Sequence, residues 1–344
     1  RVLRHEEFNS GCEASCNGPY ARPWSKTMIG YGDEIDHFVF ELTYNYGIKK
    51  YERGDDFVAI ILAGKSAVVA RAAEHNYTVH DENGETFVLS PDGYKFVLLD
   101  EPLEQGRDPV RGVAFNVSDL SRSLGTFAST NNASGLPIIW FLAATGWPGT
   151  HTHTLLVLLL TRNAVRYAAC TDYYVNVLGA TEFSRTGSDD SDHVGVVGFA
   201  ATQAKLHLIE RHGKKGQPIE HAKAFGRVAF AISDITPIYD AVQAAGDKVL
   251  HHPVTLPTPG KADVVVVIIQ DRDDYEICFV GEEGFNDLSK PVPGADAIDG
   301  PLALSRVPIA EPPPPATTAS AAAAVLCILA SESVSRAINP IHIF

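Results

Sequence analysis

The chain has 344 residues, which is enough for two domains or for one larger pseudo-symmetric unit. Its 45% hydrophobic and 20% charged residues are typical of a soluble globular protein, and a formal net charge of -14 disfavours a nucleic-acid partner because acidic surfaces repel phosphate backbones. No stretch offers the roughly 20 consecutive apolar residues that a membrane helix needs, so we expect no membrane contact.

The first part of the chain, residues 1–107, alternates strand-like runs with one helical stretch. Alternating apolar residues predict three strands, over 37–44, 86–90 and 94–99. Between the first two strands, residues 66–75 have helical spacing and good helix formers, which predicts a helix.

The later part, residues 108–290, continues the alternation. Apolar runs predict five strands, over 111–117, 205–210, 226–232, 263–270 and 275–281. A helix is predicted over 235–246, between two of these strands.

The two parts also repeat each other. FVAII at 57–61 matches FGRVA at 225–229, and each run is followed by a helix, a strand, a turn and a strand led by tyrosine. Those tyrosines are Tyr94 and Tyr275. A repeat of this size predicts duplicated modules that pack on one another.

Two segments depart from this pattern. Residues 125–171 interrupt a helix that would otherwise run from SRSL into YYVNVLG, so we interpret them as translated intron sequence or a gene-model error, with a natural surface loop as the alternative. Residues 291–344 are rich in proline and alanine and predict a disordered or mistranslated tail.

The run ELTYN at 41–45 carries a family resemblance. Together with PDGYKF, AFGRVAF and EICFVG, it resembles the glyoxalase I family of the vicinal oxygen chelate superfamily, over residues 1–124 and 172–290. The resemblance implies an α+β fold in which two βαβββ modules form a pseudo-symmetric cavity.

We place the first module at residues 1–107 and the second at 108–290. Because the sequence begins at Arg1, the first strand and helix of module one are expected to lie before it, so that the chain is a fragment. A missing strand leaves the neighbouring sheet edge unpaired.

The resemblance also implies a catalytic metal, held by four strand residues and used for proton transfer on a glutathione hemithioacetal. One ligand position lies before Arg1, and the others fall on Glu41, Ala59, Val97, Gly112, His207, Arg227 and Cys278.

Crosswise pairing of the modules sorts these positions into two sites. One gathers Glu41, Arg227 and Cys278, and the other gathers Gly112, His207, Ala59 and Val97. The second site offers one donor. In the first site Arg227 carries a fixed positive charge, which opposes a divalent cation. We therefore expect no metal cofactor, neither zinc nor nickel.

Five residues remain as candidates for function. Glu41 and His207 are the candidate acid–base residues, and the candidate substrate-binding residues are Arg227, Asn45 and Cys278. Arginine can bind an anion through two parallel hydrogen bonds. The alternative for Glu41 is a buried ion pair with Arg227, which we favour.

The other candidates have plainer alternatives. His207 can be a hydrogen-bonded core residue, Cys278 a small buried apolar residue, and Asn45 a residue that shapes its loop. Cys12 and Cys16 are expected to be reduced thiols, with redox or metal-binding roles as alternatives.

Three functions follow from these candidates. The first is a metal-independent family member that binds a small anionic metabolite, with turnover left open. The second is a lactoylglutathione lyase, and the third is a non-catalytic interaction or scaffold protein. Expected partners are a small metabolite and a protein partner or second copy. Five cysteines in 344 residues favour a reducing compartment, cytoplasmic or mitochondrial.

Overall fold

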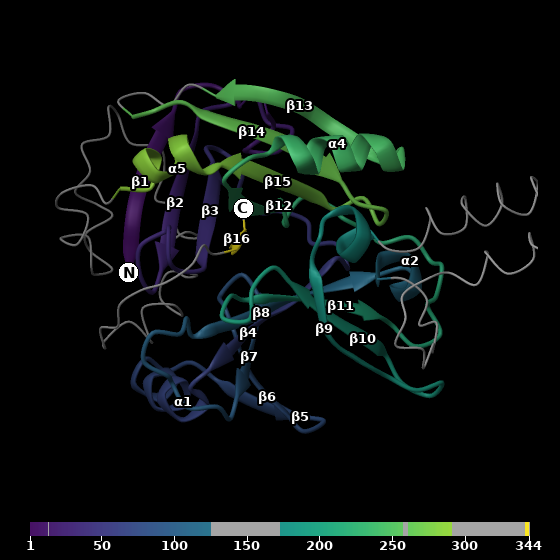
Figure 1. The fold of residues 1–344 in the computed structure, drawn as a ribbon. Helices are drawn as coiled ribbons and strands as arrows, with labels where there is room; N and C mark the ends of the chain where they lie inside the picture. Colours follow the sequence, from purple (N-terminus) through teal and green to yellow (C-terminus); the bar gives the residue numbers. More distant parts are fainter. Residues whose placement is uncertain (13, 125–172, 257–260, 291–340, 344) are drawn as a thin grey trace, which may run out of the picture.

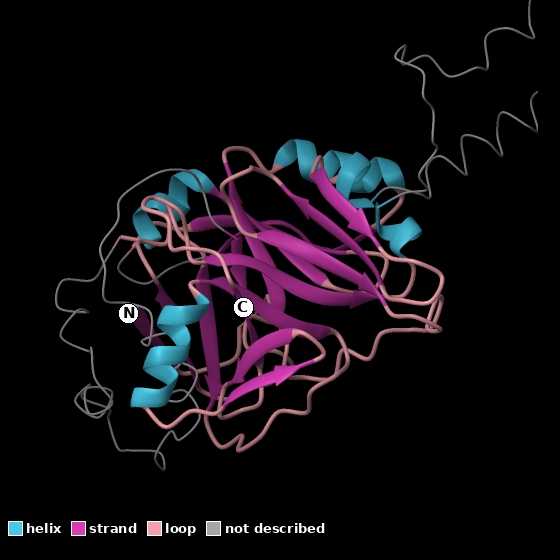
Figure 2. Cartoon of the chain, turned by 90° about the horizontal axis from the view of Figure 1, so that it is seen from below, coloured by secondary structure: helices cyan, strands magenta, loops and turns pink. Residues whose placement is uncertain are grey.

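The structure is a computed structural model that describes residues 1–12, 14–124, 173–256, 261–290 and 341–343. Two eight-stranded sheets form its centre, and the helices lie at the periphery (Figures 1 and 2). We call them sheet A and sheet B.

Sheet A is built from strands in the first and last parts of the sequence. Its strands are β1 (Val2–Phe8), β2 (Trp24–Gly30), β3 (Val39–Asn45), β12 (Arg227–Ile232), β13 (Lys248–Leu256), β14 (Val264–Gln270), β15 (Glu276–Gly281) and β16 (Ile341–Ile343). Their order is β1-β2-β3-β16-β12-β15-β14-β13.

Sheet B is built from the middle of the sequence. Its strands are β4 (Phe57–Ala63), β5 (Val79–Glu82), β6 (Glu85–Leu89), β7 (Lys95–Leu99), β8 (Val110–Val117), β9 (Thr181–Thr186), β10 (His193–Gly198) and β11 (Lys205–Glu210). Their order is β5-β6-β7-β4-β8-β11-β10-β9.

The helices connect and follow these strands. They are α1 (Lys65–Glu74), α2 (Leu120–Leu124), the π-helix η2 (Tyr173–Val177), α4 (Thr236–Ala245) and α5 (Glu282–Leu288). No helix of the described ranges is long and apolar enough to cross a membrane.

A βαβββ unit recurs in both sheets. In each complete unit the first strand runs parallel to the last strand and beside it, as β4 beside β7, β8 beside β11, and β12 beside β15. The predicted α+β class is confirmed. The repeating unit is shorter than either predicted module, because each of those modules contributes strands to both sheets.

Apolar and polar side chains alternate along the strands of sheet A, which gives the sheet one apolar face and one polar face. Phe40 of β3 and Phe230 of β12 lie in the core shared by both sheets, with Phe40 6.3 Å from Phe96 and Phe230 4.8 Å from Phe199 between ring centroids. Successive side chains on a strand point to opposite faces. Glu41 and Arg227 therefore lie on the face of sheet A that points away from this core.

The turn before each tyrosine-led strand has a residue with positive φ. Gly93 has φ 83° and Asp274 has φ 69°, so the aspartate that replaces glycine at the second turn adopts the left-handed conformation. Each following tyrosine then reaches across to the other sheet. The Tyr94 hydroxyl donates to the Ala224 carbonyl at 3.2 Å, and the Tyr275 hydroxyl donates to the Asp56 carbonyl at 3.0 Å.

The two atypical segments have different outcomes. Residues 125–171 lie outside the described residues, and the helices on either side of them, α2 and η2, pack together. Within the segment predicted to be a disordered or mistranslated tail, residues 291–340 also lie outside the described residues, and Ile341–Ile343 form the strand β16. β16 pairs with β3 on one side and with β12 on the other (Figure 1).

Candidate functional site

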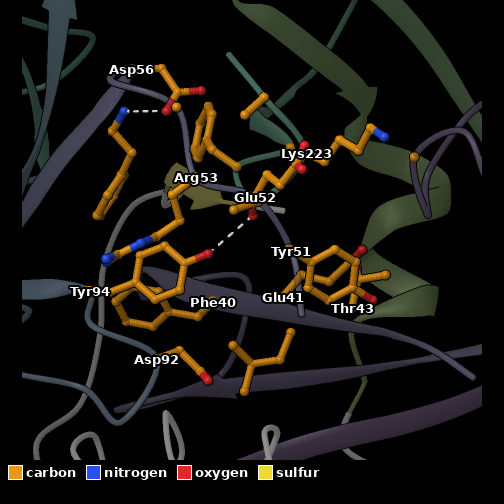
Figure 3. A pocket seen from close by; sticks show the side chains of 18 of the residues that line it. Phe40, Glu41, Thr43, Tyr51, Glu52, Arg53, Asp56, Asp92, Tyr94 and Lys223 are labelled. Carbon is orange, nitrogen blue, oxygen red and sulfur yellow. Dashed lines mark hydrogen bonds between the residues drawn. The ribbon is translucent and has the colours of Figure 1, made fainter. Parts of the chain in front are cut away.

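Glu41 and Arg227 line one pocket of about 1530 Å³. Figure 3 shows this pocket from close by, with Glu41 labelled. They lie on β3 and β12, which flank β16 in sheet A. Cys278 of β15 pairs in register with Ala229, and its thiol is close enough to interact electrostatically with both charged residues. The structure therefore brings together the three residues that were grouped from the sequence.

Arg227 is buried and fixed by three contacts of one nitrogen. Its Nη2 donates to the carbonyl oxygens of Ala14 at 3.1 Å and Ser15 at 3.0 Å, and lies 2.9 Å from the Glu276 carboxylate. The predicted ion pair with Glu41 is thus wrong. Glu276 takes that place because it lies directly opposite Arg227 on the adjacent strand β15, whereas Glu41 lies beyond β16.

One carboxylate oxygen of Glu41 forms an ion pair with Lys26 but accepts no hydrogen bond from the described residues. The Glu41 side chain is 2% exposed, and its Oε2 atom lies 3.7 Å from Lys26 Nζ. Burial raises the pKa of this carboxyl, although the positive charge of Lys26 opposes the rise. A buried acceptor of this kind stabilises a ligand that offers it an N–H or O–H group.

Beneath Glu41, strands β1 and β2 add a network of charges that the sequence predictions missed. Arg4 is buried and binds the Glu34 carboxylate through Nε at 2.5 Å and Nη2 at 3.1 Å, and it also contacts Glu6. Lys26 lies 3.2 Å from Glu6. The alternation of Arg4 and Glu6 along one strand was the available signal, because residues two apart share a face.

The raised pKa of Glu41 predicts a pH-dependent effect of the Glu41→Gln substitution. A carboxyl whose pKa is higher in the folded than in the unfolded protein contributes stability in full below its unfolded pKa, and loses it as pH rises through the folded pKa. Glutamine cannot ionise. We therefore expect the variant to gain stability relative to the parent as pH rises above about 4.3, the ordinary glutamate pKa.

Urea unfolding at a series of pH values measures this difference. The matched control is Glu104→Gln, since the Glu104 side chain is 54% exposed and makes one ion pair at 3.5 Å. A difference between Glu41→Gln and its parent that stays constant over the whole pH range would contradict a raised pKa.

Asn45 lines the pocket, but its side chain is hydrogen-bonded to residues of the neighbouring loops. Its Oδ1 accepts from Asn17 Nδ2 at 2.8 Å, and its Nδ2 donates to the Asn17 carbonyl at 3.1 Å and to the Tyr51 hydroxyl at 3.2 Å. The side chain is buried with these partners. The geometry therefore favours the loop-shaping alternative over a contact with substrate.

The loop before Asn17 covers the polar face of sheet A. A disulfide joins Cys12 and Cys16, so the expectation of reduced thiols is wrong in this structure. The two carbonyls that accept from Arg227, those of Ala14 and Ser15, lie between these cysteines. Arg227 thus fixes both the Glu276 carboxylate and this loop.

Cys278 has the environment of a small buried apolar residue. It lies in an apolar cluster with Ala229, Ile268 and Val280. Burial raises the pKa of its thiol to about 12, despite the nearby guanidinium of Arg227. The thiolate that a nucleophile or metal ligand requires is therefore disfavoured at neutral pH.

At the second predicted site, in sheet B, the His207 imidazole lies close to Gly112. A Cβ added at Gly112 would lie 2.7 Å from His207 Nε2, so only glycine fits beneath this imidazole. Ala59 and Val97 lie in an apolar cluster on β4 and β7, beyond β8 from His207. Burial lowers the pKa of His207 to about 4, which makes it a weak base at neutral pH. No hydrogen bond between described residues orients its ring.

Few of the predicted ligand positions carry side chains that bind metal ions, since Ala59, Val97 and Gly112 offer no donor atom. No group of three or more His, Cys, Asp or Glu residues in the described ranges could hold an ion. In the site of sheet A, a guanidinium lies among the candidate donors, and the Cys278 thiol holds its proton. This donor set disfavours a divalent cation because arginine keeps its charge at every accessible pH.

Comparisons with known proteins agree on one family. The family model described as "Glyoxalase domain-containing protein 4-like, C-terminal domain" matches residues 166–288 of this chain. The glyoxalase domain-containing protein 4 of Rattus norvegicus is 37% identical over 310 residues, which cover 89% of this chain and 85% of that protein. The protein named glyoxalase 1 in Caenorhabditis elegans is 34% identical, over 84% of this chain and 82% of that protein.

Solved structures support the same fold. Glyoxalase I from Zea mays matches with a TM-score of 0.58 and 20% sequence identity, over 83% of this chain and 85% of that chain. At this identity the similarity concerns the fold. The relatives named glyoxalase domain-containing protein 4 share more than a third of their residues with this chain over most of their length. The chain therefore belongs to the glyoxalase domain-containing protein 4 family, and it has the glyoxalase fold.

Proposed function

We propose that this protein binds a small metabolite with an anionic group on the polar face of sheet A, and that it does so without a catalytic metal. The observation that supports the proposal is the buried guanidinium of Arg227 in a pocket of about 1530 Å³, at a position where the family resemblance implies a metal ligand. Arginine recognises carboxylates and phosphates through paired hydrogen bonds.

The anion would compete with Glu276 for Arg227. The Glu276 side chain is 35% exposed and lies at the pocket wall, so it can turn towards solvent when a ligand carboxylate or phosphate takes its place. Arg227 remains fixed meanwhile by the carbonyls of Ala14 and Ser15. A site that keeps its cation in place before the ligand arrives loses less conformational entropy on binding.

Glu41 would supply the second contact. Its Oε2 atom can accept a hydroxyl or N–H group of the ligand, which would satisfy a buried oxygen that accepts no hydrogen bond from the described residues. The inferred ligand is therefore a small molecule with an anionic group and a nearby donor, such as a hydroxy acid or a phosphorylated alcohol.

A lactoylglutathione lyase is the alternative, and the names of several relatives favour it. Relatives named lactoylglutathione lyase include proteins of Arabidopsis thaliana and Escherichia coli, which are 33% and 36% identical over 29% and 23% of this chain. The residues at the metal positions argue against this alternative, since Ala59, Val97 and Gly112 carry no donor side chain.

Three measurements on the purified full chain distinguish these functions. Elemental analysis and a methylglyoxal–glutathione assay test the lyase, and thermal shifts with small carboxylates, phosphate esters and S-lactoylglutathione test anion binding. We expect acids to raise the melting temperature and their methyl esters to have no effect. Stoichiometric metal with rapid turnover, or equal effects of acids and esters, would overturn the proposal.

A further inference from the structure

The loop that contacts Arg227 is closed by a covalent bond. A disulfide joins Cys12 and Cys16, and the two carbonyls that accept from Arg227 Nη2 belong to Ala14 and Ser15, within the ring that this disulfide closes. The disulfide therefore limits how far these carbonyls can move while they hold the guanidinium.

Ser15 has a backbone conformation that depends on its surroundings. Its φ is 55°, in the left-handed region that residues other than glycine seldom adopt. Its side chain is exposed, so packing does not hold it there. Its amide donates to the Cys12 carbonyl at 3.0 Å, and its carbonyl accepts from Gly18 at 2.9 Å as well as from Arg227. Such a conformation persists only where the surrounding structure fixes it.

The ends of the loop have anchors that do not involve sulfur. Ala14 is 2% exposed and packs in an apolar cluster with Phe285 of α5. The Asn17 side chain accepts from the Cys12 amide at 3.0 Å and donates to Asn45 Oδ1 at 2.8 Å. We therefore expect the protein to stay folded when the disulfide is reduced, and only the backbone near Ser15 to gain freedom.

The disulfide is accessible to a soluble thiol. Cys12 and Cys16 are both partly exposed, and Cys16 lines the same pocket as Arg227. Thiol–disulfide exchange requires that a thiolate approach one of the two sulfur atoms, and exposed disulfides are the ones that exchange readily.

We propose that Cys12 and Cys16 form a redox-modification site, at which exchange with a low-molecular-weight thiol controls the affinity of the anion site at Arg227. The oxidised loop presents two fixed carbonyls to the guanidinium, and the reduced loop holds it less firmly. The effect on affinity rests on the proposed function, whereas the exchange reaction and its effect on the loop need no ligand.

The exchange consists of two steps. A thiolate of the reductant attacks one sulfur of the disulfide, forms a mixed disulfide with that cysteine, and releases the other cysteine as a thiolate that takes up a proton. A second thiolate attacks the mixed disulfide and releases the first cysteine in the same way. The protein gains two electrons and two protons, and two thiols become one disulfide. The oxidised form of the thiol reverses both steps.

Preorganisation determines the direction of the effect. Arg227 Nη2 lies 2.9 Å from the Glu276 carboxylate, which an incoming anion replaces while the two carbonyls hold the nitrogen in place. A site that has to order its cation on binding loses affinity. We expect the reduced protein to bind anions about threefold to tenfold more weakly, which corresponds to ordering one long side chain.

The first experiment measures the redox state of the full chain. The protein is equilibrated with mixtures of reduced and oxidised glutathione and treated with iodoacetamide, and mass spectrometry of its peptides gives the labelled fraction of each cysteine. Cys278 is the internal control, because it is buried and burial raises the pKa of its thiol to about 12.

Both cysteines of the loop should change together from unlabelled to labelled as the share of reduced glutathione rises. A pair that stays unlabelled in excess reduced glutathione, or that is labelled after treatment with oxidised glutathione alone, would overturn the proposal.

Hydrogen exchange measures the effect on the loop without a ligand. Reduction should speed the exchange of the Ser15 and Gly18 amides, which donate within the loop, while amides of β10 and β11 in sheet B stay unchanged. Equal exchange of the loop amides in the oxidised and reduced protein would contradict a role of the disulfide in fixing the carbonyls.

Calorimetric titration then compares the affinity of the two states for phosphate and small carboxylates. The double variant Cys12→Ser with Cys16→Ser cannot form the bond, so it should bind as weakly as the reduced parent and should not respond to dithiothreitol. Equal affinity of the oxidised and reduced parent would overturn the proposal. If neither state binds an anion, the proposed function fails, and labelling and hydrogen exchange still decide whether the pair is a redox site.

Discussion

Replacing Arg227 by methionine is expected to abolish anion binding and to lower the free energy of unfolding by about 2–4 kcal/mol. The substitution removes the guanidinium that holds the carbonyls of Ala14 and Ser15, and it leaves Glu276 without its ion pair. Loss of the hydrogen bonds to the two carbonyls accounts for most of the expected destabilisation, because Glu276 is 35% exposed and can be solvated.

Matched variants separate binding from stability. Arg227→Lys keeps the charge but not the planar fork, and should bind anions at least about tenfold more weakly than the parent. Glu276→Gln removes the competing carboxylate, so it should strengthen anion binding. Calorimetric titration and urea unfolding measure both effects. Undiminished binding by Arg227→Met would show that the anion site lies elsewhere.

Replacing Arg4 by methionine is expected to destabilise the protein by about 3–5 kcal/mol, because the substitution leaves a buried carboxylate without its partner. The side chains of Arg4 and Glu34 are 3% and 1% exposed, and two of the arginine nitrogens contact the two carboxylate oxygens. Such a pair contributes little net stability when intact, but its disruption isolates a charge away from water.

The double variant Arg4→Met with Glu34→Leu tests this explanation. We expect it to recover most of the loss, since both charges are then replaced by apolar groups of similar volume. Urea unfolding of the parent, both single variants and the double variant gives the coupling energy. Equal destabilisation by the single and double variants would show that packing around Arg4, and not the unpaired carboxylate, determines the cost.

Short-range patterns in the sequence predicted much of the fold. Alternating apolar residues located the strands around Glu41, Tyr94 and Tyr275, and the FVAII–FGRVA repeat anticipated that Ala59 and Arg227 occupy equivalent places. The two turns of the repeat, at Gly93 and Asp274, share the left-handed conformation in the structure.

Long-range pairing was harder to anticipate. Arg227 was expected to pair with Glu41 because both residue types suit a shared cavity, yet strand register places Glu276 opposite Arg227. The place of β16 between β3 and β12 depends on contacts across most of the sequence. Local propensity carries no information about such contacts.

The candidate site shows the same limit. Glu41, Arg227 and Cys278 were grouped through a family resemblance, whereas the charges of Arg4 and Lys26 beneath Glu41 were missed. The strands that carry them, β1 and β2, were not among the strands predicted from the sequence. Asn45 was expected to contact a substrate, but its amide is used by Asn17 and Tyr51.

The fit of His207 over Gly112 sets the number of ligands that the protein can take up. The repeated architecture offers two equivalent positions, and at the one in sheet B the His207 imidazole lies 2.7 Å from where a methyl group at position 112 would be. A titration should therefore reach saturation at one equivalent of metabolite per chain, with a simple hyperbolic isotherm and no cooperativity.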